Sequence, residues 1–179
     1  ASLESIGDLK SVKSIGSGAF GSYGYYDENN KYKNAYCTSL KQIGNMPKLE
    51  TIGESAFDGC RLLASVGELS SVTSIGGNAF EGCSGLTELT LPDSVASIGD
   101  GAFICCSDLS KITSLAEIPP MCGFKVFNGV NKTNCELIVP VISVIAYKQA
   151  EVWNEFSNIR GFSGVEVTVA DKTRKIVVE

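Results

Sequence analysis

"CSGLTELTLPDSVASIGDGAFICC", residues 83–106, is one copy of a phrase that recurs along this 179-residue chain. It contains SIGDGAF at 97–103, and related phrases stand at 14–20 (SIGSGAF), 51–57 (TIGESAF) and 74–80 (SIGGNAF). A catalytic motif is needed once, whereas a phrase repeated at a fixed interval of roughly 20 to 50 residues is typical of a solenoid. We therefore interpret the phrase as the structural unit of a coil, in which each repeat buries its apolar side against its neighbours.

Four regularly spaced cysteines set the period of the repeat: Cys37, Cys60, Cys83 and Cys106 follow one another at a constant step of 23 in the numbering. Other apolar residues keep the same step, namely Leu40, Leu63, Leu86, Leu109, Ile52, Ile75, Ile98, Phe57, Phe80 and Phe103. This pattern predicts about five 23-residue turns with these side chains inside. Because stacking in register points the four cysteines in parallel rather than toward one another, we expect free, buried thiols.

One repeat can be followed from residue to residue. Leu89 and Leu91 alternate with polar neighbours, which predicts a short strand with its apolar side turned inward. Gly99 is expected to permit a sharp corner of the backbone. Ala102 and Phe103 follow, and we expect them on one helical turn that drives the ring into the core. Stacked repeats would then place the phenylalanines in a column of rings.

Composition excludes several functional classes. The net charge is −5, whereas nucleic-acid binding calls for clustered Lys and Arg. Histidine is absent, which removes Ser-His-Asp and Cys-His nucleophile systems and histidine metal sites. The acidic turn 27–30 lacks the ligand spacing of a calcium loop. We predict no catalytic residue, no cofactor, no metal and no transmembrane segment, since the longest apolar run, 137–146, is short and interrupted.

Residues 83–106 and the preceding stretch CRLLASVGELSSVTSIGGNAFEGC, residues 60–83, resemble the BspA-like leucine-rich repeats, the 23-residue bacterial class. The resemblance covers roughly residues 1–160. It implies a right-handed leucine-rich-repeat solenoid with a parallel β-sheet on one face and short helical turns. It also implies a secreted or cell-surface binding protein without catalytic residues. No binding residue carries over, because the family motif consists of core positions.

The chain departs from the repeat at both ends. The separation of Phe20 from Cys37 is much longer than the separation of three that the later repeats show, which indicates a 14-residue insertion, placed at 23–36. In the last repeat Gly129 stands where the pattern calls for cysteine. Since the chain opens at Ala1 partway into a repeat and without a leader, we expect a mature form or an excised piece.

The segment after the repeats, CELIVPVISVIAYKQAEVWNEFSNIRGF at 135–162, resembles the closing segment of the same family. We expect a cap at 135–160 with a helix in which Ser143 is the N-cap. Ala146, Ala150 and Trp153 would share the helical face that covers the open end of the coil. Residues 161–179 alternate apolar and polar residues, which predicts a β-hairpin, either as an added cap or as the start of a following domain.

Two surfaces are candidates for ligand binding. The insertion holds five of the six tyrosines, and tyrosine with Gly, Ser and Asn is typical of binding loops. We predict Tyr25, Tyr26 and Tyr32 as contact residues; the alternative is a longer loop whose tyrosines cover the core. The second candidate is the polar concave face, with Gln42, Glu88 and Lys111 as contacts, and plain surface is the alternative there.

These observations predict a non-catalytic binding or adhesion module, secreted or on the cell surface, that recognises a protein or a glycan. The alternative is a passive spacer that presents another domain. The sequence leaves the ligand and the oligomeric state open. It also leaves open whether Cys122 and Cys135 pair.

Overall fold

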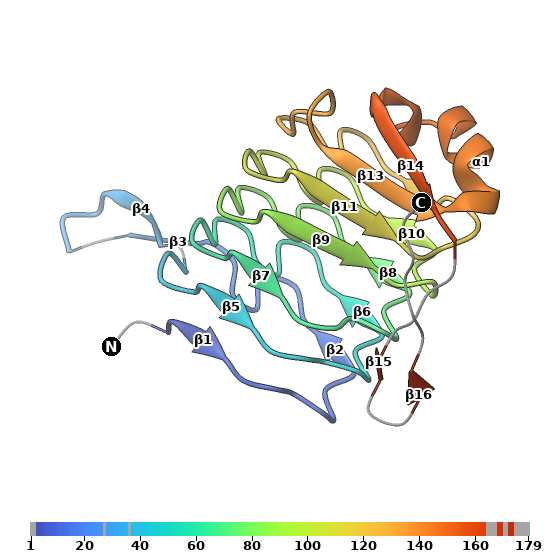
Figure 1. The fold of residues 1–179 in the computed structure, drawn as a ribbon. Coiled ribbons are helices and arrows are strands. Elements are labelled where there is room, and N and C mark those ends of the chain that lie inside the picture. Colours follow the sequence, from blue (N-terminus) through green and yellow to red (C-terminus); the bar gives the residue numbers. More distant parts are fainter. Residues whose placement is uncertain (1–2, 27, 36, 164–167, 170–171, 174–179) are drawn as a thin grey trace.

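The protein is a solenoid of parallel strands, seen here in a computed structural model that describes residues 3–26, 28–35, 37–163, 168–169 and 172–173. About five turns stack along one axis, with the N-terminal strand at one end and a small helical cap at the other (Figure 1). We number the repeats one to five by their phenylalanines, which are Phe20, Phe57, Phe80, Phe103 and Phe127. The predicted fold class is confirmed.

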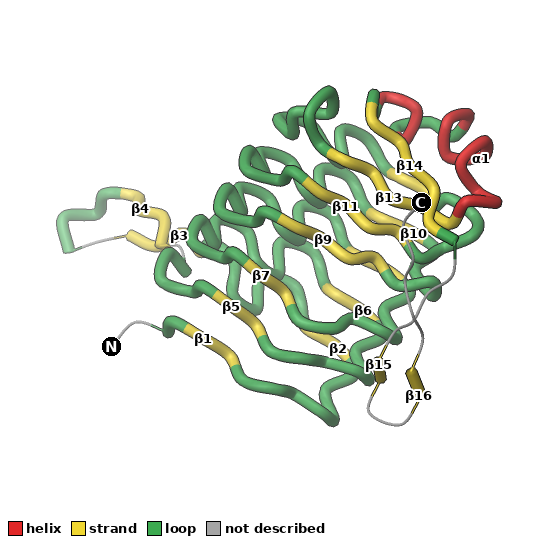
Figure 2. Tube along the Cα trace, in the orientation of Figure 1, coloured by secondary structure: helices red, strands yellow, loops and turns green. Residues whose placement is uncertain are grey.

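One row of parallel strands forms the front of the solenoid, with two-residue strands in the first repeats and four- or five-residue strands toward the cap (Figure 2). β1 (Ser5–Ile6), β5 (Gln42–Ile43) and β7 (Ser65–Val66) pair in parallel, as do β9 (Glu88–Leu91), β11 (Lys111–Ser114), β13 (Glu136–Pro140) and β14 (Asn158–Phe162). Glu88 faces Lys111 in register, one period further along the chain. In β9 the burial alternates, with Leu89 and Leu91 inside and Glu88 and Thr90 outside.

A second, narrower sheet forms the other side, in addition to the one face that the resemblance implied. Its strands have two residues each: β2 (Ser14–Ile15), β6 (Thr51–Ile52), β8 (Ser74–Ile75), β10 (Ser97–Ile98) and β12 (Met121–Cys122). Ile15, Ile52, Ile75 and Ile98 are buried. The Ser-Ile or Thr-Ile start of each repeated phrase is therefore a strand that turns its isoleucine into the core.

Five phenylalanine rings stack through the core, as the period predicted. Phe20, Phe57, Phe80, Phe103 and Phe127 follow one another with ring centroids 5.3, 5.1, 5.2 and 5.5 Å apart. Successive ring planes differ by 15° or less. Phe57, Phe80 and Phe103 are completely buried. Such contacts add about 0.5–1.5 kcal/mol per pair beyond the burial of the rings.

The expected helical turn at the phenylalanine is a series of tight turns, which we call the corner segment (99–106 in the fourth repeat). Alternate N–H groups bond within the segment, as Ala102 does to the Gly99 carbonyl. The intervening N–H groups, those of Gly101, Phe103 and Cys105, donate to carbonyls of the next repeat at 2.8–2.9 Å. The segment therefore pairs with its neighbour like a strand while keeping the curvature of a turn.

The glycine after isoleucine is needed for a reason other than the one predicted. A Cβ on Gly99 would lie 2.5 Å from the backbone nitrogen of Gly77, and one on Gly76 would lie 2.6 Å from that of Glu54. Close approach between repeats, not a positive φ, thus excludes a side chain there. The positive φ falls two residues later, at 101 (61°), and the equivalent Asn78 (53°) adopts it as well.

The cysteines line the same corner. Cys60, Cys83 and Cys106 are buried, and each thiol donates to the carbonyl of the phenylalanine of the preceding repeat, at 3.2–3.3 Å. Cys37 differs from the prediction, because it is only half-buried. The seven cysteines are unbridged, so Cys122 and Cys135 do not pair in this structure.

Thiol accessibility tests this arrangement. Burial raises the pKa of Cys60 and of Cys106 to about 12, so both thiols stay protonated at pH 8. We expect a thiol reagent at pH 8 to leave Cys60, Cys83 and Cys106 unmodified in the folded protein and to modify them in denaturant without reductant. Because the pKa of these thiols is higher in the folded protein than in the unfolded chain, their protonated form contributes to stability at pH values below the ordinary thiol pKa. This contribution is lost as pH rises toward 12. A Cys60–Cys83 disulfide found by mass spectrometry would contradict the prediction of free thiols.

The cap closes the last repeat with two aromatic side chains. It comprises η1 (Val141–Ser143), α1 (Val144–Gln149) and η2 (Trp153–Glu155), followed by β14. Tyr147 and Trp153 are fully buried. The Tyr147 hydroxyl donates to the Ala116 carbonyl at 3.0 Å, and the Trp153 indole N–H donates to the Pro120 carbonyl at 2.9 Å. The Pro120 carbonyl is equivalent to that of Ala96, which accepts a hydrogen bond from Met121 of the next repeat, so Trp153 here takes the place of a further repeat.

The predicted helical face of the cap is wrong. Ser143 precedes the helix but makes no side-chain capping bond, and Ala146 is exposed. α1 ends at Gln149, Ala150 is extended, and Val152 has a φ of 70°. This break rotates Trp153 out of the helical period and onto Phe127, at 5.3 Å between ring centroids.

Two hairpins complete the described chain. The insertion forms β3 (Tyr23–Tyr26) and β4 (Tyr32–Ala35), an antiparallel pair. β15 (Thr168–Val169) pairs antiparallel with β16 (Lys172–Thr173), as predicted, although residues 164–167, 170–171 and 174–179 of the expected hairpin lie outside the described residues. β14 continues to Phe162, across the proposed boundary at 160, and the division into domains stays a prediction.

The missing cysteine of the fifth repeat has a simple explanation. Phe127 follows Phe103 at a step one longer than the period, because this repeat holds one extra residue. The position equivalent to Cys106 is therefore Val130, which is buried, and not Gly129. In the part of the chain that the structure describes, no helix has the length and apolarity that a membrane span requires.

Candidate binding surfaces

The tyrosine hairpin, β3 and β4, projects away from the stacked repeats (Figure 1). Tyr26 faces Tyr32 in register, so these two tyrosines share one face of the hairpin, whereas Tyr25 faces Lys33 and belongs to the opposite face. Tyr26 is 66% exposed, as a ligand contact requires. The side chains of Tyr25 and Tyr32 lie outside what the structure describes, and their exposure stays a prediction.

A polar contact ties the base of this hairpin to the second repeat. The Ser22 hydroxyl donates a hydrogen bond to the carboxylate of Asp58. Beside it, burial and the charge of Asp58 raise the pKa of Glu81. Tyr36 and the side chain of Tyr23, at the two ends of the insertion, lie outside the described part. The contact seen joins the hairpin to the first two repeats through Ser22.

The second predicted surface is a row of residues on the front sheet. Register places Gln42 beside Ser65, and Glu88 beside Lys111, at the same position of successive repeats. The structure thus aligns Gln42, Glu88 and Lys111 along one line on the outer face. Gln42 lies on the strand that follows the hairpin, whereas Glu88 and Lys111 lie two and three repeats further on. The hairpin and most of the row are therefore separate surfaces.

Charges on the front sheet are paired between neighbouring repeats. The Lys111 ammonium lies 3.5 Å from the Glu88 carboxylate, and Arg160 lies 3.2 Å from Glu136. The same pairing joins Lys41 to Glu4 at 2.9 Å and lowers the pKa of Glu4. Exposed pairs of this kind contribute little to stability, because solvent screens their charges. Their effect is to leave a polar surface with little net charge.

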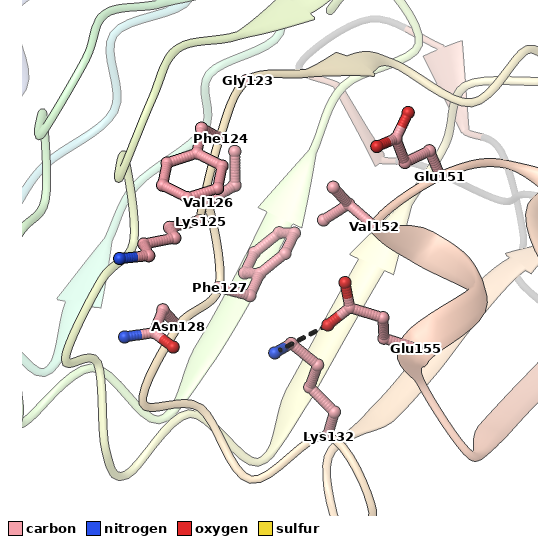
Figure 3. A pocket seen from close by; sticks show the side chains of 10 residues that line it. All are labelled: Gly123, Phe124, Lys125, Val126, Phe127, Asn128, Lys132, Glu151, Val152 and Glu155. Carbon is pink, nitrogen blue, oxygen red and sulfur yellow. Dashed lines mark ion pairs between the residues drawn. The ribbon is translucent and has the colours of Figure 1, made fainter.

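A third surface, which was not predicted from the sequence, lies on the fifth repeat and the cap. Met121 is 77% exposed where the earlier repeats place Ser97 or Ser74, and Phe124 is 71% exposed where the fourth repeat has Asp100. Beside Phe124 lies a cavity of about 280 Å³ between the corner segment of this repeat and the cap (Figure 3). Large apolar residues at two positions that are polar or small elsewhere were the signal in the sequence.

Metal binding finds no support among the residues that the structure describes, since these contain no group of three or more Cys, Asp or Glu side chains able to hold an ion. The described surfaces offer aromatic rings, hydroxyls, amides and paired charges. Such groups suit the recognition of a ligand surface.

Six copies of the BspA type leucine-rich repeat region match residues 27–137. The chain belongs to this family. The matched BspA-type repeats run from the turn of the hairpin to the start of β13. They include the front row and the corner segment of the fifth repeat, whereas β3, with Tyr25 and Tyr26, precedes the matched range.

Two solved structures with leucine-rich repeats are similar to the chain. The pneumococcal vaccine antigen PcpA shares 20% identity and a TM-score of 0.55, over 99% of this chain and 42% of that one. The Treponema pallidum leucine-rich repeat protein TpLRR shares 23% identity and a TM-score of 0.44, over 70% of this chain and 76% of that one. The likeness to PcpA shows the fold, and this chain spans less than half of the PcpA length. No curated protein matches the chain.

Proposed function

We propose that this BspA-type chain is a non-catalytic binding module of a secreted or cell-surface protein, and that it recognises a protein or a glycan through the tyrosine hairpin. The observation that carries the proposal is the projection of β3 and β4 beyond the repeats, with Tyr26 66% exposed. An exposed aromatic side chain of this kind supplies a large contact area at low entropic cost.

The scaffold suits this role because it is rigid where the hairpin is attached. The ring of Phe20 stacks on Phe57 at 5.3 Å, and Ser22 bonds to Asp58, so the residues just before the hairpin are fixed to the second repeat. A loop held by a rigid scaffold is a common arrangement for binding. The row of Gln42, Glu88 and Lys111 would then offer polar contacts to a ligand that extends across the front sheet.

Display outside the cell is supported by one structural relative, PcpA, which is described as a vaccine antigen. The buried core thiols are compatible with such a location, because burial raises the pKa of Cys60 to about 12 and keeps this thiol protonated.

Replacing Tyr25, Tyr26 and Tyr32 together by alanine is expected to abolish ligand binding. The melting temperature should stay within a few degrees, because the hairpin lies outside the phenylalanine stack. The measurement is a screen of glycans and extracellular proteins against the wild-type chain, followed by titration of the hits with the triple variant.

Two further variants distinguish binding at the hairpin from binding at the other two candidate surfaces. Phe124→Ser removes an exposed aromatic ring in the fifth repeat and should leave hairpin binding unchanged. A variant with Gln42, Glu88 and Lys111 changed to alanine reports on the front row. If the tyrosine variant unfolds, those rings belong to the core. If it binds normally, the row is the better candidate, and a wild-type chain with no ligand at all would favour the spacer.

A further inference from the structure

The corner segments form a continuous hydrogen-bond ladder that stops at the fifth repeat. In the first four repeats the N–H of the phenylalanine donates to the next repeat at 2.7–2.9 Å, and Phe103 donates in this way to Val126. The N–H groups two residues before and after bond likewise, as Gly101 and Cys105 show. Among the described residues, nothing accepts a hydrogen bond from the equivalent N–H groups of Lys125, Phe127 and Gly129.

The cap replaces a sixth repeat only in part. Trp153 and Tyr147 satisfy carbonyls of the fifth repeat, and the rings of Trp153 and Phe156 each lie 5.3 Å from Phe127. At the corner segment, however, a cavity separates the cap from the fifth repeat. The cavity of about 280 Å³ is lined there by six consecutive residues, 123–128, and by residues of the cap across from them. Gly123 has no side chain, so its backbone lines the cavity.

The rim of this cavity offers both apolar and acidic contacts. Phe124 is 71% exposed, and the Lys125 ammonium lies 4.8 Å from its ring centroid. Across the cavity, Glu155 is engaged by Lys132 at 3.0 Å. Glu151 is exposed and makes no ion pair with a described residue. Figure 3 shows Glu151 and Val152 facing the Phe124 end of the corner segment.

We propose that this cavity binds a peptide segment of another polypeptide, which adds to the fifth repeat with the curved backbone of a sixth corner segment. Its carbonyls, on alternate residues, would accept hydrogen bonds from Lys125, Phe127 and Gly129. Strand addition of this kind gives affinity through the backbone and specificity through the side chains. A glycan fits less well, because its hydroxyls do not repeat at the spacing of alternate peptide carbonyls.

The neighbouring side chains determine which peptide fits. The peptide residue whose side chain points toward Phe127 must be small, because the rings of Trp153 and Phe156 already cover Phe127. A basic side chain near its amino end faces Glu151, since the corner segments run parallel. An apolar side chain next to it packs on Phe124.

The free protein provides a first test by amide hydrogen exchange. The N–H groups of Gly101, Phe103 and Cys105 are bonded, so they should exchange slowly. Those of Lys125, Phe127 and Gly129 should exchange at least about tenfold faster, because they lack partners. Equal protection of the two sets would overturn the proposal.

The second test selects binders from a displayed library of linear ten-residue peptides, with counter-selection against Phe124→Ser. Selected peptides should shift the amide protons of Lys125, Phe127 and Gly129 downfield and slow their exchange. Phe124→Ser should weaken binding roughly tenfold through lost apolar contact, and Glu151→Lys about fivefold for a basic peptide. Both residues are exposed, so the melting temperature should change little.

The outcomes are distinct from those of the hairpin proposal. The variant with Tyr25, Tyr26 and Tyr32 changed to alanine should bind the selected peptides normally. Failure to enrich any peptide would overturn the inference. So would peptides that shift hairpin amides and leave the three corner amides unchanged.

Discussion

Replacing Phe80 by alanine is expected to lower the free energy of unfolding by about 3–5 kcal/mol. Phe80 is completely buried, and its ring lies between those of Phe57 and Phe103 at 5.1 and 5.2 Å. The variant leaves a cavity in the middle of the stack, which the flanking repeats cannot fill because their backbones are bonded to one another. Chemical denaturation of both proteins gives the difference.

Phe20→Ala is the matched control for position in the stack. Phe20 is only partly buried, and among the residues that the structure describes its ring neighbour is Phe57. Its replacement should cost roughly half as much, since both the burial and the ring contacts are smaller. A Phe80→Ala effect below about 1 kcal/mol, the size typical of a surface substitution, would show that the stack is not the main core.

Trp153→Ala is expected to cost a similar amount, about 3–5 kcal/mol, and to loosen the C-terminal end selectively. Trp153 is completely buried, covers Phe127 and donates to the Pro120 carbonyl at 2.9 Å. The variant removes the ring and leaves that carbonyl without its partner. Amide exchange by NMR should show faster exchange in β13 and β14, with β6 and β8 unchanged.

Trp153→Phe separates the contribution of ring packing from that of the hydrogen bond to Pro120. It keeps most of the apolar burial but removes the indole N–H, so its cost should be about 1–3 kcal/mol, the penalty for an unsatisfied buried group. Equal effects of the phenylalanine and alanine variants would mean that ring packing adds little. No effect of the phenylalanine variant would mean that the hydrogen bond to Pro120 contributes nothing measurable.

Periodicity predicted the core because identical residues must stack wherever repeats have identical lengths. Phe57, Phe80 and Phe103 needed only their spacing to be placed. The same logic put Gln42, Glu88 and Lys111 on one line. The ion pair between Glu88 and Lys111 depends on opposite charges in neighbouring repeats. It could be identified only once the register of β9 against β11 was known.

The cap and the corner segment could not be predicted from spacing. A helical period was applied to Ala146, Ala150 and Trp153, but the positive φ of Val152 breaks the period before the tryptophan. Tyr147, which is not on the predicted face, covers the end together with Trp153, and its hydroxyl donates to the Ala116 carbonyl. The open N–H groups of the fifth repeat were likewise invisible, since their state depends on what lies beside them in space.

The regular spacing of the repeats sets the distance between the two ends of the solenoid. The tyrosine hairpin leaves the first repeat, whereas the peptide cavity lies between the fifth repeat and the cap. Every repeat between them uses the same register, so one could be duplicated or deleted without altering either end. Each such event would change the separation of the two sites along the axis by about 4.8 Å, the distance between paired strands. Evolution or design could thus adjust the distance between two binding sites in fixed steps.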